Sequence, residues 1–277
     1  MRERIAKYVF AGAAALTVAA VGTICLFLFL EGSPAILKIG LVDFLGGSAW
    51  RPGEELFGIL PMLAGSGSIT LGAALLGVPI GILTAIFLAH FASPRIDGLL
   101  RPVITLMAGI PSVVYGFFGL MVIVPLVREL CGGRGMCILS ASILLAMMIL
   151  PTIIVVAEAA LRAVPRPIYE GALALGATPE RSIFGAVLPA ARSGVLAAIV
   201  LGLGRAIGET MAVIMVAGNQ PILPTSILKG VRTLTTNVVL EMGYATDLHR
   251  DALVATALVL FVLTLALNAI FSTLKRK

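Results

Sequence analysis

The sequence predicts an all-α integral membrane protein with about six transmembrane helices. Of its 277 residues, 59% are hydrophobic and only 12% are charged, and the mean hydropathy is +1.08. A soluble core cannot bury that share of apolar side chains, so the bilayer has to solvate them. A spanning helix needs roughly 20 apolar residues, and a chain of this length holds about six such helices with their loops. We therefore expect a single transmembrane domain over residues 1–277.

The apolar runs place the spans in order along the chain. The first, residues 8–30, follows Arg2, Arg4 and Lys7 and is too long for the apolar core of a secretory signal, so we interpret it as an uncleaved span. The other runs predict spans at residues 66–91, 102–127, 138–161, 194–217 and 251–273. Prolines lie within these runs at Pro79, Pro111, Pro125 and Pro151. Because each proline removes a backbone donor that lipid cannot replace, we expect bent helices in a packed bundle.

Basic residues predict the orientation. Arg95, Arg101, Arg162, Arg166 and Arg181 all lie in segments that share a side with the N-terminus when six spans alternate. Since cytoplasmic segments carry the excess of lysine and arginine, we expect both termini in the cytoplasm. The same rule accounts for the net charge of +6. Because the basic residues stand singly between apolar runs, we do not expect nucleic-acid binding.

The short loop between the third and fourth spans carries Cys131 and Cys137. The expected orientation puts this loop outside, where a disulfide can persist, and two free thiols at a helix boundary are the alternative. His90 and His249 have no cysteine or second histidine at ligand spacing, so we expect no metal site. The chain contains no G-x-x-x-x-G-K-S/T phosphate loop, so we expect no ATP site of that kind.

Between the fourth and fifth spans, residues 162–193 predict two short helices. Pro167 can start the first, which ends near Leu175, and Gly176 can close it in a left-handed conformation. Thr178 then caps a second helix that begins at Pro179. We expect the two helices to meet at an angle.

This loop resembles that of the binding-protein-dependent ABC importer permeases. The matching residues are Glu170, Gly171, Ala172, Gly176, Leu188 and Pro189, at the family's spacing of E-A-A, glycine and leucine-proline. Gly171 stands where the family has alanine, and Ala186 where it has isoleucine. The resemblance implies that the loop docks in a groove of a separate ATPase subunit, which would bind the ATP. An amphipathic interfacial turn without a partner is the alternative.

Arg205 and Glu209 stand four residues apart near the middle of the fifth span, which predicts that they share one helical face. An arginine at mid-bilayer costs roughly 2.5–3.5 kcal/mol, so we expect the glutamate to pair with it and both to face the bundle interior or a hydrated path. A guanidinium there can bind a tetrahedral oxyanion through two parallel hydrogen bonds. A buried ion pair that only fixes helix packing is the alternative.

The sequence around this pair resembles the phosphate-specific ABC importer permeases, and their C-type subunit more closely than the A-type. The matching segments are Arg205-Ala-Ile-Gly-Glu209-Thr-Met-Ala-Val, Ala217-Gly218-Asn219, Ala108-Gly-Ile-Pro111-Ser-Val-Val-Tyr115-Gly116, and Trp50-Arg-Pro52 with Phe57-Gly58-Ile-Leu-Pro61. The resemblance implies a substrate path that includes Arg205 and Glu209. Ser112 and Tyr115 are expected in the same path, beside the bend at Pro111.

The resemblance also implies an assembly. The chain would be a transport subunit without enzymatic activity or a cofactor of its own, in a bacterial inner membrane. A second, related permease would complete a heterodimer, two ATPase subunits would hydrolyse ATP, and an external phosphate-binding protein would deliver the substrate.

Other functions remain open at this point. A permease for another oxyanion or an organic solute would share the same coupling loop, and a secondary carrier or channel would need no ATPase. A membrane-embedded enzyme would need a serine, histidine or carboxylate cluster within the spans, and the sequence has only Arg205 and Glu209. The outer loop, residues 218–250, is interpreted as a gate, a docking surface or a solvated connector.

Overall fold

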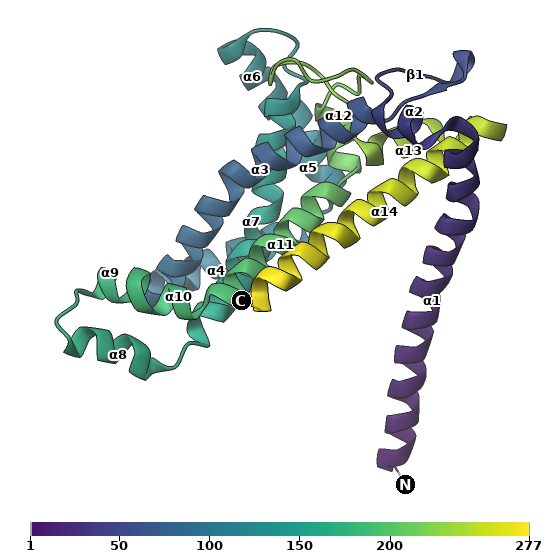
Figure 1. Cartoon of the computed structure of the whole chain (residues 1–277). Helices are drawn as coiled ribbons and strands as arrows, with labels where there is room; N and C mark the ends of the chain where they lie inside the picture. The colour runs from purple at the N-terminus through teal and green to yellow at the C-terminus, as the bar shows by residue number, and fades with distance from the viewer. Residues whose placement is uncertain (1, 277) are drawn as a thin grey trace.

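In the computed structural model, which describes residues 2–276, the chain is a bundle of helices (Figure 1). Long helices run between two ends of the molecule, and shorter ones lie at these ends or interrupt the long ones. In chain order they are α1 (Arg2–Ile39), α2 (Leu41–Gly46), α3 (Leu60–Ile86), α4 (Pro94–Gly109), α5 (Ser112–Phe118), α6 (Val124–Cys131), α7 (Ile138–Arg162), α8 (Arg166–Ala174), α9 (Pro179–Ser182), α10 (Leu188–Ala190), α11 (Arg192–Gly208), α12 (Met211–Val216), α13 (Leu234–Glu241) and α14 (Asp247–Arg276). Turns of π-helix extend α3 (Phe87–Phe91), join α5 to α6 (Gly119–Ile123) and join α9 to α10 (Ile183–Val187).

A small antiparallel hairpin follows α2. Its strands are β1 (Trp50–Arg51) and β2 (Leu56–Phe57), joined by a turn of 3-10 helix (Pro52–Glu54), and Trp50 lies opposite Phe57. Both aromatic side chains are buried in a cluster with Phe44 and Leu234. The hairpin is therefore packed against α2 and α13 rather than free in solvent.

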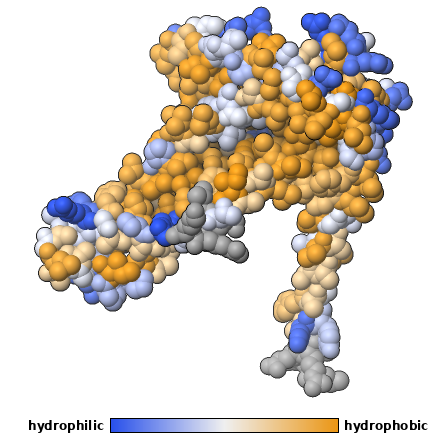
Figure 2. Space-filling model, in the orientation of Figure 1, coloured by the Kyte–Doolittle hydropathy of each residue, from blue (hydrophilic) through white to orange (hydrophobic). Residues whose placement is uncertain are grey.

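In residues 2–276, five helical segments are long and apolar enough to cross a membrane. They are Ala6–Ile39, Leu60–Phe91, Ser112–Cys131, Ile138–Arg162 and Asp247–Phe271. A sixth is reached if Pro179–Ala190 and Arg192–Gly208, which meet at a bend of 74°, count as one span. On the face shown in Figure 2, an apolar band separates two polar ends, as expected for a chain solvated by a bilayer.

Four of the expected spans differ from the helices that form. α3 begins at Leu60 rather than at residue 66. α1 continues through Pro34 to Ile39, so it runs well past residue 30. The expected span 102–127 is interrupted, because α4 ends at Gly109 and α5 begins at Ser112. The expected span 194–217 is interrupted as well, because α11 ends at Gly208 and α12 begins at Met211.

The centre of the bundle is formed by α3, α7 and α11, which approach closely at small residues. A Cβ atom added at Gly81 of α3 or at Gly202 of α11 would lie 2.8 Å from the side chain of Ile153. Ile153 of α7 is fully buried between them. Without a hydrophobic driving force in lipid, such close packing is what holds membrane helices together.

The two ends of the bundle carry different elements. In Figure 1 the N-terminus and the helices α8 to α10 lie at the lower end, and α14 runs down toward the same end. The hairpin, α6, α12 and α13 lie at the upper end. α1 packs on α14 through Gly32, which contacts Leu258 and Ala255, whereas its N-terminal half stands away from the bundle.

Candidate functional site

The interruption of the third expected span has a local cause. Ile110 and Pro111 are extended, because proline disfavours the helical conformation in the residue before it and has no N–H to donate. The Tyr115 hydroxyl donates a hydrogen bond of 2.9 Å to the carbonyl oxygen of Met107, in the last turn of α4. The buried tyrosine thereby satisfies a carbonyl that the break releases, as an apolar solvent requires.

The interruption of the fifth expected span separates Arg205 from Glu209. Glu209 follows the last residue of α11 in an extended conformation, and its Oε1 accepts a hydrogen bond of 3.2 Å from the backbone N–H of Ala212. Its carbonyl oxygen accepts a hydrogen bond of 3.0 Å from the Thr235 hydroxyl of α13. The expected ion pair with Arg205 is absent among the described residues. The prediction of a shared helical face was wrong, because the carboxylate caps α12 instead.

Arg205 remains in α11, three residues before its end, and is half-buried. It lies 13 residues from the start of α11, or about 20 Å along the helix at 1.5 Å per residue. Within the described part of the chain the Arg205 guanidinium makes no hydrogen bond or ion pair, and it interacts electrostatically with Tyr115. The half-buried side chain therefore lies near the C-terminal end of α11 with its donors unused in the described part of the chain.

The two interrupted spans lie side by side. A Cβ atom added at Gly116 of α5 would lie 2.7 Å from the Met215 sulfur and 3.0 Å from the Ala212 Cα of α12. The backbone of α5 at Gly116 is therefore packed directly against α12. Ser112 is the first residue of α5, and its side chain is half-buried. Broken helices that meet in a membrane expose polar backbone ends, which suits them to bind ions or polar substrates. The polar ends of α5 and α12, together with the Arg205 guanidinium, have the chemistry to bind an anion.

The pair of short helices between α7 and α11 forms as the sequence predicts. The N–H of Gly176 bonds to the carbonyl of Leu173, and the N–H of Ala177 to that of Ala172, which is the Schellman pattern of a helix end. Gly176 has φ +87°, and the Thr178 hydroxyl accepts a hydrogen bond from the N–H of Arg181.

The tip of this pair is open to contact. Leu175, beside Gly176 at the tip, is 92% exposed. The other matching residues, Glu170, Gly171, Ala172, Leu188 and Pro189, are exposed or half-buried on the same pair of helices.

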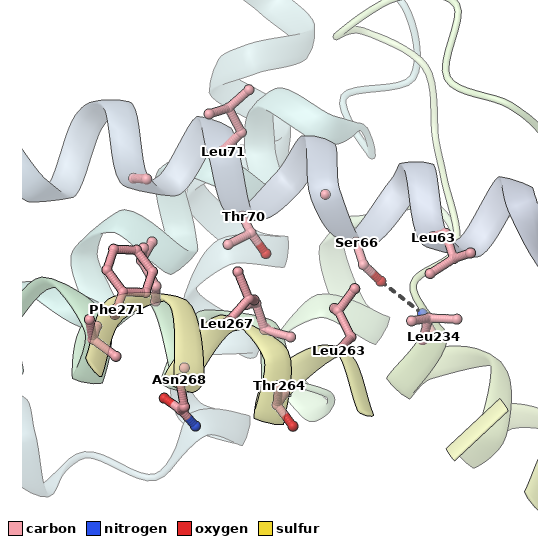
Figure 3. Close-up of a pocket in the computed structure, with 16 residues that line it drawn as sticks. Leu63, Ser66, Thr70, Leu71, Leu234, Leu263, Thr264, Leu267, Asn268 and Phe271 are labelled. Atoms are coloured by element: carbon pink, nitrogen blue, oxygen red, sulfur yellow. Dashed lines mark hydrogen bonds between the residues drawn. The ribbon is translucent and has the colours of Figure 1, made fainter. Parts of the chain in front are cut away.

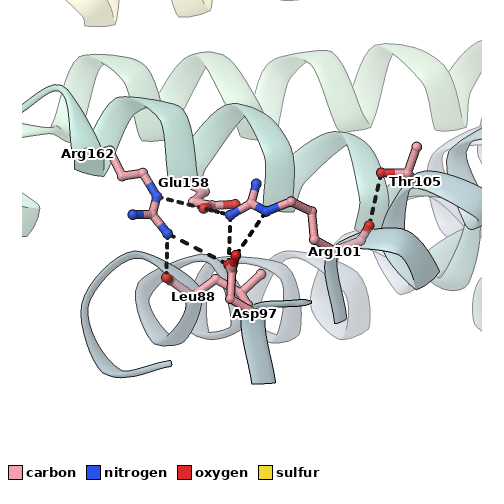
Figure 4. A network of polar contacts seen from close by, with 6 residues as sticks. All are labelled: Leu88, Asp97, Arg101, Thr105, Glu158 and Arg162. Atoms are coloured by element: carbon pink, nitrogen blue, oxygen red, sulfur yellow. Dashed lines mark hydrogen bonds and ion pairs between the residues drawn. The ribbon is translucent and has the colours of Figure 1, made fainter. Parts of the chain in front are cut away.

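Sequence reasoning missed an ionic cluster that joins α4, α7 and the end of α3 (Figure 4). The buried Glu158 accepts hydrogen bonds of 2.8 Å from Arg101 and 2.7 Å from Arg162, and Arg162 also bonds to the carbonyl of Leu88. Arg101 pairs in addition with Asp97 at 2.7 Å. The hydrogen bond from Arg101 holds the pKa of Asp97 below its usual value. The hydrogen bonds to Asp97 and Glu158 raise the pKa of Arg101. The spacings Asp97 to Arg101 and Glu158 to Arg162, four residues each, were the available signal.

The two loop cysteines remain free thiols in this structure. Cys137 is 1% exposed at the start of α7, where its sulfur lies 3.6 Å from the Ser140 hydroxyl, and Cys131 is exposed at the end of α6. This structure therefore matches the alternative of two free thiols, and the disulfide that the sequence allows stays a prediction to be tested.

A cavity of about 340 Å³ lies on another face of α11, between α3 and α14 (Figure 3). Its walls are mostly apolar and include Leu203, Gly204 and Ile207 of α11, together with Leu267 and Phe271 of α14. Arg205 is not among the residues that line it. The cavity is therefore separate from the region between α5 and α12.

Comparisons with known proteins agree with this geometry. Residues 77–277 match the family model of the binding-protein-dependent transport system inner membrane component. A Bacillus subtilis protein named as the probable ABC transporter permease YqgH is 38% identical over 265 residues, covering 93% of this chain and 86% of its own length. The phosphate transport system permease protein PstC of Xylella fastidiosa is 37% identical over 264 residues, covering 87% of this chain and 81% of its own length.

The fold has a counterpart among solved structures. A chain of the MetNI methionine ABC transporter, solved in inward-facing conformations, is similar with a TM-score of 0.63 and 19% sequence identity. The match covers 82% of this chain and 98% of that chain. At that identity, the comparison describes the architecture alone.

Proposed function

This chain belongs to the family of binding-protein-dependent transport system inner membrane components, and from that premise we propose that it is one permease subunit of an ATP-driven phosphate importer. It is a multi-pass protein of the bacterial inner membrane. The name of the PstC relative supports phosphate as the substrate. The observation in the structure that carries the proposal is Arg205, whose guanidinium has no ion pair among the described residues and lies beside two broken helices.

The site chemistry favours an oxyanion. The donors of Arg205 form a planar fork that matches two oxygens of a phosphate, and Glu209 does not compete for that fork because it caps α12. Ser112 and the N-terminal turn of α5 stand on the neighbouring broken span and would supply further donors. Tyr115 contributes by holding α4 to α5 through Met107 rather than by donating to the substrate.

ATP hydrolysis belongs, in this proposal, to two partner subunits, with a second related permease and an external phosphate-binding protein completing the complex. The exposed tip around Gly176 is the surface that would dock on the ATPase. The ATPase subunit, and not this chain, would bind the ATP. The termini and this tip would face the cytoplasm, which agrees with their position at one end of the bundle in Figure 1.

The test is uptake by the reconstituted complex in vesicles, with phosphate compared against sulfate and molybdate. We expect ATP-dependent accumulation of phosphate, and accumulation of sulfate or molybdate instead would contradict the proposed substrate. Arg205→Ala should abolish uptake while the subunits still co-purify. Arg205→Lys, which keeps the charge but loses the fork, should retain only part of the activity.

The docking role has its own test at Gly176. A β-branched residue is strained at φ +87°, and no neighbouring atom lies within 4 Å of an added Cβ, so Gly176→Val changes the backbone rather than the packing. We expect the variant to insert normally but to lose the link between ATP hydrolysis and uptake. Gly98→Val in α4, in equally open surroundings, without positive φ and outside the docking loop, is the matched control. Unchanged coupling in Gly176→Val would refute the docking role.

A further inference from the structure

A buried carboxylate at the end of α13 ties together four separate parts of the chain. Glu241 is 6% exposed, and its Oε2 accepts hydrogen bonds from Trp50 Nε1 at 2.7 Å and from His249 Nε2 at 2.9 Å. Its Oε1 accepts a hydrogen bond from Arg232. These partners come from the hairpin, from α14 and from the segment before α13. Glu241 therefore fixes the C-terminal end of α13 against all three.

Arg232 extends this network to the end of α12. Its Nε donates to the carbonyl of Asn219 at 3.1 Å, and its Nη1 donates to Asn237 Oδ1 at 3.0 Å. Only 14% of its side chain is exposed. A buried charge of this kind is stable only while its partner keeps the opposite charge, so Arg232 depends on the ionised Glu241.

The other end of α13 is attached to the candidate path. The backbone N–H of Leu234 donates to the Ser66 hydroxyl of α3 at 3.0 Å, the bond drawn in Figure 3. The Thr235 hydroxyl donates to the carbonyl oxygen of Glu209, which lies in the break between α11 and α12. Thr235 and Glu241 are six residues apart, or about 9 Å along α13. One short helix thus connects the outer network to the break that follows Arg205.

We propose that Glu241 is a positioning residue of the anion path: by anchoring α13 through Trp50, Arg232 and His249, it holds Thr235 on the Glu209 carbonyl and so maintains the break beside Arg205. This inference rests on the proposed function. Glu241 acts at a distance and does not touch the substrate. In this structure the Thr235 hydroxyl donates to the Glu209 carbonyl, and without it that carbonyl would lose this hydrogen bond.

The experiment compares Glu241→Gln, Thr235→Val and the double variant in the reconstituted complex. We expect both single variants to lower the maximal rate of phosphate uptake. Glu241→Gln should lower it about tenfold or more, because it weakens buried hydrogen bonds to a charged group, and Thr235→Val by about threefold to tenfold, because its hydroxyl bonds to a neutral carbonyl. The double variant should be no slower than the slower single variant, because both changes break the same connection. Thr235→Ser, which keeps the hydroxyl, should restore most of the rate.

The controls separate positioning from other roles. Glu54→Gln changes a glutamate of the same outer hairpin that is 59% exposed and pairs with Arg51, and it should leave uptake unchanged. The concentration of loaded binding protein that gives half-maximal uptake should also stay unchanged in Glu241→Gln, whereas a docking residue would shift it. If Glu241→Gln does not assemble, Trp50→Phe, which removes a single hydrogen bond to Glu241, tests the same connection.

The possible failures are distinguishable. Lack of phosphate uptake by the unmodified complex would reject the proposed function itself. Normal uptake by the unmodified complex together with a normal rate in Glu241→Gln would overturn only the positioning role. A double variant whose loss equals the product of the two single losses would show that Glu241 and Thr235 act independently, which would also overturn it.

Discussion

Two glycines of α3, only two residues apart, make a sharp test of the packing between α3 and the segment before α13. A Cβ atom added at Gly65 would overlap the carbonyl oxygen of Arg232 and lie 3.3 Å from the Arg232 carbonyl carbon and from Val231 Cβ. A Cβ atom added at Gly67 meets nothing within 4 Å. We therefore expect Gly65→Ala to destabilise the protein and Gly67→Ala to stabilise it.

The magnitude follows from two contributions. Alanine in a helix interior gains about 0.5–1 kcal/mol over glycine, and this gain is the same at both positions. Overpacking costs about 1–3 kcal/mol, and the upper half of that range applies at Gly65 because the obstacle is a backbone carbonyl that cannot rotate away. The two variants should thus differ by about 2–3 kcal/mol.

The assay is thermal unfolding of the purified protein in detergent, with the two variants measured side by side. For a domain of this size each kcal/mol corresponds to a shift of about 2–4 °C in the melting temperature. Equal melting temperatures for Gly65→Ala and Gly67→Ala would refute the argument, since they would mean that α3 does not press on the segment before α13.

Individual side chains give further tests. Glu158→Gln replaces the carboxylate that Arg101 and Arg162 share with an uncharged amide. Because both arginines are about half-exposed, we expect a loss of only about 1–2 kcal/mol in the free energy of unfolding. A larger or absent loss would contradict the geometry of Figure 4. In a Cys25→Ser background a maleimide should label Cys131 and spare Cys137, whereas protection of both would indicate a disulfide. Burial raises the pKa of Glu241, but hydrogen bonds from Trp50, His249 and Arg232 outweigh it and hold the pKa below its usual 4.5. Its contribution to stability is therefore complete at neutral pH and is lost only as the pH falls below about 4.5, so a melting temperature that declines between pH 7 and pH 5.5 in the wild type but not in Glu241→Gln would contradict this assignment.

The helix pair around Gly176 shows what sequence reasoning can predict well. Its glycine and its capping threonine act through hydrogen bonds between residues no more than five apart, and its prolines act through their own fixed φ, so the local sequence contains all that is needed. The bend at Pro111 is a similar case, because proline excludes the helical conformation from the residue before it.

The break after Gly208 could not be predicted in the same way. The sequence around Arg205 and Glu209 is compatible with a continuous helix, and a spacing of four residues then places both side chains on one face. The break is stabilised by the Thr235 hydroxyl, 26 residues away along the chain. A partner at that distance leaves no periodic signal near Glu209.

The sequence by itself determined the membrane class, the apolar runs that become long helices, the helix pair around Gly176 and the resemblance that identifies the family. Each of these depends on composition or on interactions between near neighbours. Only the tertiary structure decided that Glu209 caps α12 instead of pairing with Arg205, and that Glu241 meets Trp50 across 191 residues of sequence. The physical reason is that burial makes such polar groups find partners wherever the packed helices bring them, and packing is a property of the whole chain.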